Sequence, residues 1–147
     1  MATLTITVTE AVSLGLGATD RGTVNTQTVT VDEVDHRIMD VGTAWVDVIK
    51  FAGANAAGTF KDGTVKYLRI TNLDASNFLS LRVKDNAKEY FVKVEPKDHF
   101  ILGNTVMDSE SGSAYGTDVS FAAIDTIQAK ADTAIVQMEY FVASVSS

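Results

Sequence analysis

The sequence predicts an all-β protein, an antiparallel β-sandwich for which a jelly roll is the preferred topology. Thr and Val, which fit a pleated strand better than a helix, make up 35 of the 147 residues. Apolar and polar residues alternate in short segments that are separated by turn-forming residues. About eight or nine such segments follow one another, a density typical of a sandwich or barrel. This pattern does not separate a jelly roll from an immunoglobulin-like sandwich.

We expect the whole chain, 1–147, to form a single domain. Its N-terminal half contains four expected strands. In the first, Leu4, Ile6 and Val8 alternate with threonines, and residues 1–12 could also form an arm. The expected strands are 3–9, 24–31, 37–41 and 43–51. The expected loops are 13–22 and 51–63, and a polar turn with room for one helical turn is expected at 32–37.

Three segments in the middle of the chain each combine one apolar face with one charged face. They are residues 66–72, 78–85 and 88–95, and polar turn residues separate them. This pattern is typical of an antiparallel sheet with one face on the core and one in water. Pro96 ends the third segment because it has no N–H to donate to a neighbouring strand.

The C-terminal part predicts strands at 99–102, 121–131 and 133–144, with a polar loop at 107–118. A helix is the alternative for 118–130, where Ile124, Ile127 and Lys130 fall at helical spacing. Both faces of 133–144 are fairly apolar. We therefore expect either a central strand that is covered on both sides or a strand buried in a subunit interface.

Composition excludes several classes of function. The chain has no cysteine, which rules out disulfides and thiolate chemistry. It has no apolar run near the ~18 residues that a membrane span needs, and its first ten residues lack the features of a signal peptide. A net charge of −7 makes it a poor candidate for tracking a phosphate backbone. We expect neither a nucleic acid nor a membrane as a partner.

The charge is unevenly distributed along the chain. Residues 61–97 carry eight basic and five acidic side chains, so that stretch is +3 and the remainder is −10. These charges could simply lie on solvated strand faces, or they could form a basic patch that docks on an acidic partner. The candidate contact residues for such a patch are Lys66, Arg69, Arg82, Lys84 and Lys93.

The sequence offers little catalytic chemistry. His36 lies among acidic residues in DEVDHRIMD, which fits a solvated acidic turn better than a metal site, because its spacing matches neither HExxH nor an EF-hand. His99 is interpreted as a structural or surface residue. Neither a GxSxG elbow nor a phosphate-binding loop is present. We expect no catalytic residue, no cofactor and no metal, and hence no enzyme.

A carbohydrate-binding module is the alternative from another class, since β-sandwiches can present planar aromatic rings to sugars. Tyr67, Phe91 and Tyr115 are the candidates for exposed rings. Trp45 is the only tryptophan, and packing in the core is its favoured role.

One arrangement of strands and turns runs through three stretches, YLRITNLDASNFLSLRV, EYFVKVEPKDHFIL and FAAIDTIQAKADTAIVQMEYFVAS. A strand ending in Thr-Asn, an Asp/Ser turn and a Leu-alternating strand are followed by an aromatic-led strand, a proline turn and a closing strand that ends near Glu-Tyr-Phe. In this arrangement the region from Lys66 to Ser144 resembles small virion proteins of tailed bacteriophages, especially marine and cyanobacterial phages. The resemblance implies a structural role, as a capsid decoration (cement) protein or as a component of the tail, neck or fibre. Residues 1–63 carry no such resemblance.

The resemblance also implies partners and a location. A decoration protein binds and stabilises the shell of the major capsid protein, and a homo-oligomer is expected, with a trimer favoured. It assembles in the host cytoplasm and lies on the exterior of the virion. We expect this role first, the tail, neck or fibre second, and the carbohydrate-binding module third.

Overall fold

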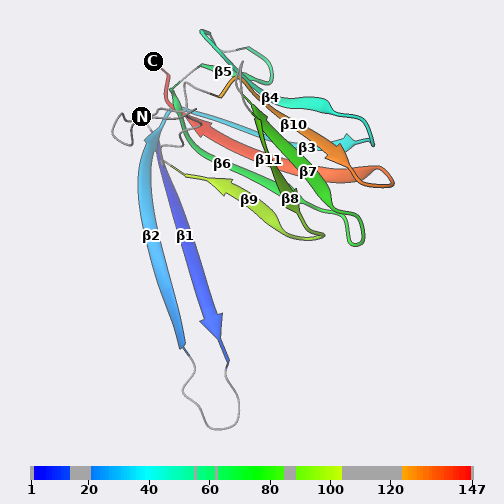
Figure 1. Ribbon diagram of the computed structural model, residues 1–147. Coiled ribbons are helices and arrows are strands. Elements are labelled where there is room, and N and C mark those ends of the chain that lie inside the picture. The colour runs from blue at the N-terminus through cyan, green and yellow to red at the C-terminus, as the bar shows by residue number, and fades with distance from the viewer. Residues whose placement is uncertain are drawn as a thin grey trace, which may run out of the picture.

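Strands account for the regular secondary structure of the computed structural model, which describes residues 2–13, 21–54, 56–61, 63–84, 89–103 and 124–146. Figure 1 shows their arrangement. The strands are β1 (Ala2–Val12), β2 (Arg21–Val31), β3 (Glu33–Val41), β4 (Val46–Ala52), β5 (Thr59–Lys61), β6 (Val65–Asn72), β7 (Leu79–Lys84), β8 (Glu89–Val94), β9 (His99–Leu102), β10 (Thr126–Ala131) and β11 (Val136–Ser144). Within these ranges there is no helix long and apolar enough to cross a membrane.

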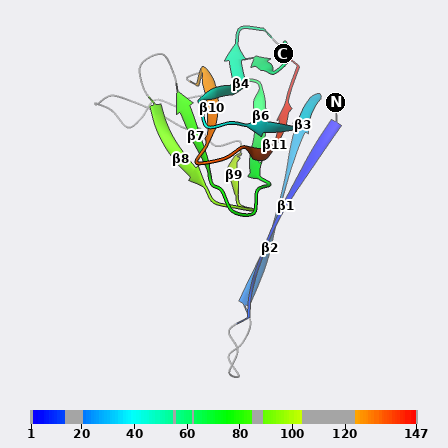
Figure 2. The same ribbon diagram turned by 90° about the vertical axis from the view of Figure 1, so that its right-hand side faces the viewer.

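Two sheets pack face to face and enclose the core. One has the order β5-β4-β10-β7-β8 and the other the order β3-β11-β6-β9. All pairings are antiparallel except the short parallel one between β4 and β5. The chain crosses repeatedly between the sheets, and both layers are visible edge-on in Figure 2. The predicted all-β antiparallel sandwich is thus confirmed, whereas the jelly-roll topology stays a prediction.

The alternation of the sequence explains which side of each strand is buried. In β7, Leu79, Leu81 and Val83 are buried and the residues between them are partly exposed. β10 follows the same pattern, with Ile127 fully buried. The opposite sheet contributes the inner faces of β6 and β11. Burial of each such side chain stabilises the fold by roughly 1.5–3 kcal/mol before the cost of ordering the chain.

β11 lies in the centre of its sheet, between β3 and β6. Its inner face is buried, and its outer face carries Gln137, Glu139 and Phe141 with partial exposure. β11 is thus a central strand of its sheet, but the described residues leave its outer face partly exposed, so burial of that face in a subunit interface stays a prediction.

β1 and β2 form a separate two-stranded hairpin, which we call the arm. They pair along their whole length, from Ala2 opposite Val31 to Val12 opposite Arg21. The arm extends away from the sandwich in both views (Figures 1 and 2). Its base is fixed to the body, because the Asp32 N–H donates to the carbonyl oxygen of Ser144 at 2.9 Å. Val31, at that base, is buried.

Several segment boundaries differ from the expectations. The turn expected at 32–37 is wrong, because β3 begins at Glu33 and pairs with β11 over its full length. The helix alternative for 118–130 is wrong where the structure describes that range, since 126–130 belong to β10. The loop expected at 51–63 contains β5. Residues 107–118 lie outside the described part of the chain.

Candidate docking face

The outer face of the five-stranded sheet gathers aromatic and charged side chains from four strands. Pairing places Asp47 of β4 opposite Gln128 of β10, Gln128 opposite Arg82 of β7, and Arg82 opposite Phe91 of β8. Because directly opposite residues share a face, these four side chains form one row across the sheet. We call the surface that carries this row the docking face.

Two flanking rows complete the docking face. On one side, Lys130 lies opposite Ser80, and Ser80 lies opposite Lys93. On the other side, Thr126 lies opposite both Lys50 and Lys84, and Lys84 lies opposite Glu89. The outward residues belong to the same strands whose alternate positions build the core, so a rigid sheet positions them.

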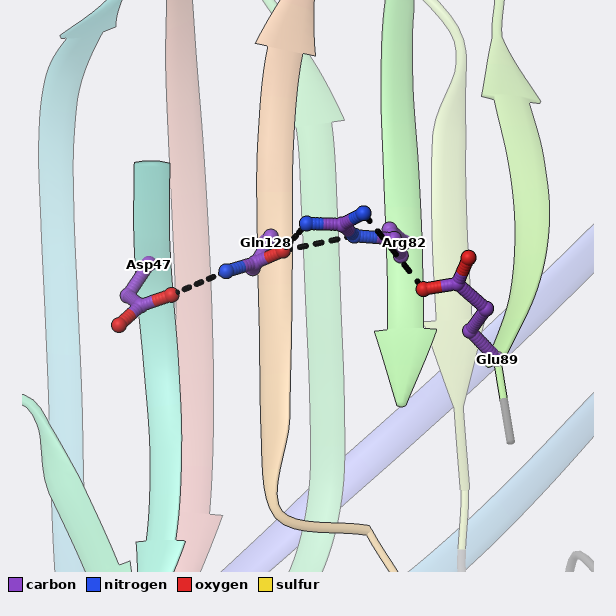
Figure 3. A network of polar contacts seen from close by, with 4 residues as sticks. All are labelled: Asp47, Arg82, Glu89 and Gln128. Atoms are coloured by element: carbon purple, nitrogen blue, oxygen red, sulfur yellow. Dashed lines mark hydrogen bonds and ion pairs between the residues drawn. The ribbon is translucent and has the colours of Figure 1, made fainter. Parts of the chain in front are cut away.

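A polar network holds the central row together (Figure 3). Gln128 Nε2 donates to Asp47 Oδ1 at 2.6 Å, and Arg82 Nε donates to Gln128 Oε1 at 2.7 Å. Arg82 Nη1 also lies 3.5 Å from Glu89 Oε2. The hydrogen bond from Gln128, and then the one from Lys50, lower the pKa of Asp47. Asp47 therefore stays ionised at neutral pH, and the guanidinium is held in a fixed orientation.

An aromatic pair lies next to this network. The ring centroids of Trp45 and Phe91 are 5.9 Å apart, and the Phe91 side chain is 58% exposed. Arg82 Cζ lies 4.7 Å from the Trp45 centroid and Lys130 Nζ lies 5.6 Å from it, within the range of cation–π attraction. Trp45, for which the sequence favours core packing, is instead half-buried against outward-facing residues.

The docking face is locally basic on an acidic chain. Its five cations are Lys50, Arg82, Lys84, Lys93 and Lys130, and its three carboxylates are Asp47, Glu89 and Glu95. Two of these carboxylates are neutralised by adjacent lysines, because Lys50 pairs with Asp47 at 3.0 Å and Lys93 pairs with Glu95 at 2.7 Å. The surface offers cations and one exposed ring to a partner, an arrangement suited to an acidic surface.

The five contact residues expected from the sequence do not share one surface. Arg82, Lys84 and Lys93 lie on the docking face. Arg69 lies on the outer face of the other sheet, where it pairs with Glu139, and Lys66 is half-buried at the start of β6. Sequence reasoning missed Trp45, Gln128 and Lys130 as members of this surface. The only signal for Gln128 and Lys130 was the alternation of 126–131, and the position of Trp45 had none, because the neighbours of all three residues depend on the order of the strands.

The acidic residues around His36 are separated by the pleat of β3. Asp35 turns toward the inner side, where it accepts a hydrogen bond from Tyr140 Oη at 3.0 Å. His36 turns outward, with Nε2 3.4 Å from Glu139 Oε2. Throughout the described ranges, no three His, Asp or Glu side chains come together as metal ligands. His99 is exposed at the start of β9, beside Asp98.

The open edge between the sheets, where β3 approaches β4 and β5, is hollowed. Arg37, Thr59 and Tyr140 line this hollow. Arg37 Nε donates to Asp35 Oδ1 at 3.1 Å, and Tyr140 bonds the other oxygen of the same carboxylate. Burial first, and then the hydrogen bond and charge of Asp35, raise the pKa of Tyr140 to about 12. The polar groups here satisfy one another, so the hollow is better explained as part of the sandwich edge than as a reaction site.

Comparison with known proteins adds no relative, since no protein-family model, no curated protein and no solved structure matches this chain.

Proposed function

We propose that this chain is a structural protein of a tailed-phage virion, a decoration (cement) protein that binds the assembled shell of the major capsid protein through its docking face. The observation that carries the proposal is the docking face itself, a basic surface with an exposed ring on a chain of net charge −7. The resemblance of 66–144 to small phage virion proteins supports the same role. The proposed location is the exterior of the virion, after assembly in the host cytoplasm.

The strand order also supports this assignment. Eight strands fall into the orders β3-β11-β6-β9 and β4-β10-β7-β8, with the chain passing back and forth between the sheets. This order fits a jelly roll, the double-sheet architecture built from two Greek keys that occurs in viral capsid proteins. We propose this topology together with the function.

The proposed mechanism is stabilisation by binding, without catalysis. A protein that binds only the assembled shell shifts the assembly equilibrium by mass action. Many copies on a symmetric lattice strengthen the effect through multivalency, even when each contact is weak. Cations at the rim of a contact accelerate and orient the encounter, and salt weakens their effect.

The location is tested by quantitative mass spectrometry of purified virions, with this chain counted relative to the most abundant shell protein. Hundreds of copies per particle are expected for a decoration protein. A few copies to a few dozen would move the chain to the tail, neck or fibre. Complete absence from the particles would refute the virion role.

The docking face is tested separately by co-sedimentation with shells stripped of this chain. We expect the triple variant Lys84→Gln, Lys93→Gln, Lys130→Gln to bind about tenfold more weakly, since each rim charge contributes about 0.5 kcal/mol. The matched control is Lys61→Gln, Lys66→Gln, Lys97→Gln, which removes the same charge away from this face. Equal weakening of both variants would contradict the assignment of the face.

Carbohydrate binding is the second candidate, and the exposed ring of Phe91 favours it. The ring of Trp45 is a poorer platform, because Arg82 and Lys130 already lie over it. Titration with a panel of glycans, followed by the fluorescence of this single tryptophan, tests the idea. A saturable change that Phe91→Ala abolishes would favour a sugar site over a shell contact.

A further inference from the structure

The arm presents two chemically different faces. Pairing places Leu4, Ile6, Val8 and Val12 on one face, together with Val29 and Val31. The other face is formed mainly by the threonines at positions 3, 5, 7, 9, 26, 28 and 30, and it also carries Val24, which is exposed. The apolar face is half-buried at Leu4, Ile6 and Val29, where the arm runs beside the sandwich (Figures 1 and 2).

The same face continues into the distal half of the arm, residues 8–12 and 21–25, where Val8 and Val12 flank Glu10 and lie beside Asn25 and Thr23. This half lies clear of the sandwich (Figure 1). There Val8 is 47% exposed and Val12 is 49% exposed. An isolated two-stranded hairpin is marginally stable in water and needs a third strand or a packed layer. The described residues of one copy supply the distal half with neither, so the distal valines lack the support that the proximal part has.

The sandwich exposes a second apolar surface on the outer face of its four-stranded sheet, which we call the receiving face. Val34 and Ile38 of β3 and Ile101 of β9 are 54%, 55% and 40% exposed. Pairing places the half-buried rings of Phe141 and Tyr67 between these strands. Clustered apolar side chains of this kind mark contact sites on soluble proteins.

The charges of the two surfaces also match. The only charged residues of β1 and β2 are Glu10, which lies on the apolar face between Val8 and Val12, and Arg21, which carries the opposite charge and pairs with Val12, so the distal half has no net charge. On the receiving face, Glu139 pairs with both His36 and Arg69, so its central charges are compensated. A strongly charged partner would complement neither surface, whereas the two surfaces complement each other.

We propose that the distal half of the arm binds the receiving face of a second copy of this chain, so that copies are joined by exchanged arms. The contact continues the apolar row along which the arm already runs beside its own sandwich. Each 11-residue strand spans about 36 Å, long enough to reach beyond its own sandwich. Each copy would contribute its own distal arm and its own receiving face to the contact, about 20 residues per copy in total, which is near the lower end of a standard interface.

This contact does not depend on the proposed function, because the arm and the receiving face share no residue with the docking face. Reciprocal exchange closes a pair, and the same contact made head to tail closes a ring. In either arrangement the distal half acquires a packed layer that the described residues of its own copy do not supply.

Sedimentation velocity of the full chain between about 1 and 100 µM is the first test. We expect an oligomer that Val8→Asp, Val12→Asp dissociates with at least a tenfold rise in dissociation constant. The matched control is Thr7→Asp, Thr9→Asp, which adds the same charge to the opposite face of the same strand and should leave the oligomer intact. A monomer throughout this range, or an oligomer that both variants weaken equally, would overturn the proposal.

Cross-linking gives a second readout that does not require a destabilised variant. The chain has no cysteine, so mixing Val12→Cys with Ile38→Cys can form a heterodisulfide only between copies. We expect this product to form well above the level obtained when Lys93→Cys, on the docking face, replaces Ile38→Cys. Equal yields with the two partners would place the distal arm elsewhere and refute the assigned contact.

Discussion

Tyr140 provides a sharp test of how the edge of the sandwich is built. Its side chain is only 2% exposed, and its hydroxyl donates to Asp35 Oδ2. Both burial and the neighbouring carboxylate favour the protonated phenol, which raises its pKa from 10 to about 12. Removal of the hydroxyl by Tyr140→Phe deletes this hydrogen bond and this titration while the ring stays in place.

The expected magnitude follows from the shift in pKa. Below pH 10 the phenol is protonated in both the folded and the unfolded chain, so its contribution to stability is constant. Above pH 10 the unfolded chain releases the proton while the folded chain retains it, which favours unfolding. A shift of two units corresponds to about 2 to 3 kcal/mol of stability lost as the pH rises through about 12.

The assay is urea unfolding of wild type and Tyr140→Phe from pH 9 to 12, followed by Trp45 fluorescence. At pH 9 we expect the wild type to be more stable by about 1 to 2 kcal/mol, the value of a hydrogen bond to a charged group that keeps some solvent contact. Above pH 10 this advantage should shrink and then reverse. Tyr90, whose pKa is also raised by burial, is present in both proteins and cancels. Stability curves that stay parallel across this range would refute the reasoning.

Three further substitutions test other parts of the fold by urea unfolding at neutral pH unless stated. Leu81→Ala, at a fully buried position, should cost about 2 to 5 kcal/mol, whereas Ile135→Ala, 67% exposed, should stay within about 0.5 kcal/mol; similar losses would contradict the assigned core. Gly58→Ala, at a φ of 70°, should cost about 1 to 2 kcal/mol, whereas Gly53→Ala should be neutral or slightly stabilising; an added Cβ meets open space at both positions, so a neutral Gly58→Ala would refute the turn geometry. Asp74 accepts hydrogen bonds from the backbone N–H groups of Asn77 and Ser76, which lower its pKa. Asp74→Ala should therefore destabilise the protein at pH 7 and lose this effect as the pH falls below 4. A destabilisation that is independent of pH would show that the charge is not involved.

Strand alternation made the two faces of β7 and β8, in the five-stranded sheet, predictable from the sequence. The period of two in 78–85 and 88–95 assigns Leu81 to the core and Arg82 and Lys93 to the outer face, as the structure has them. The turn expected at 32–37 fails for a physical reason. β3 is an edge strand, so polar residues such as His36 face solvent and contact a single neighbouring strand, and their polarity resembles that of a turn.

The members of the docking face from distant segments could not be predicted in the same way. Gln128 bridges Asp47 and Arg82 only because β10 lies between β4 and β7. That order results from long-range pairing, which a local pattern does not encode. β5 likewise becomes a strand through its pairing with β4, at a site whose glycines and alanines favour a loop.

The central positions of β10 and β11 determine when folding can finish. β7, β8 and β6 are made early, but the strands that join them to β4 and β3 come from residues 126–144. During synthesis neither sheet can form its middle, so both halves of the core stay open to solvent until those residues leave the ribosome. Pairings between segments so far apart in sequence also close slowly. The two strands of the arm are neighbours in sequence, so their pairing needs no late residues, but a lone hairpin becomes stable only when a sandwich supplies a packed layer.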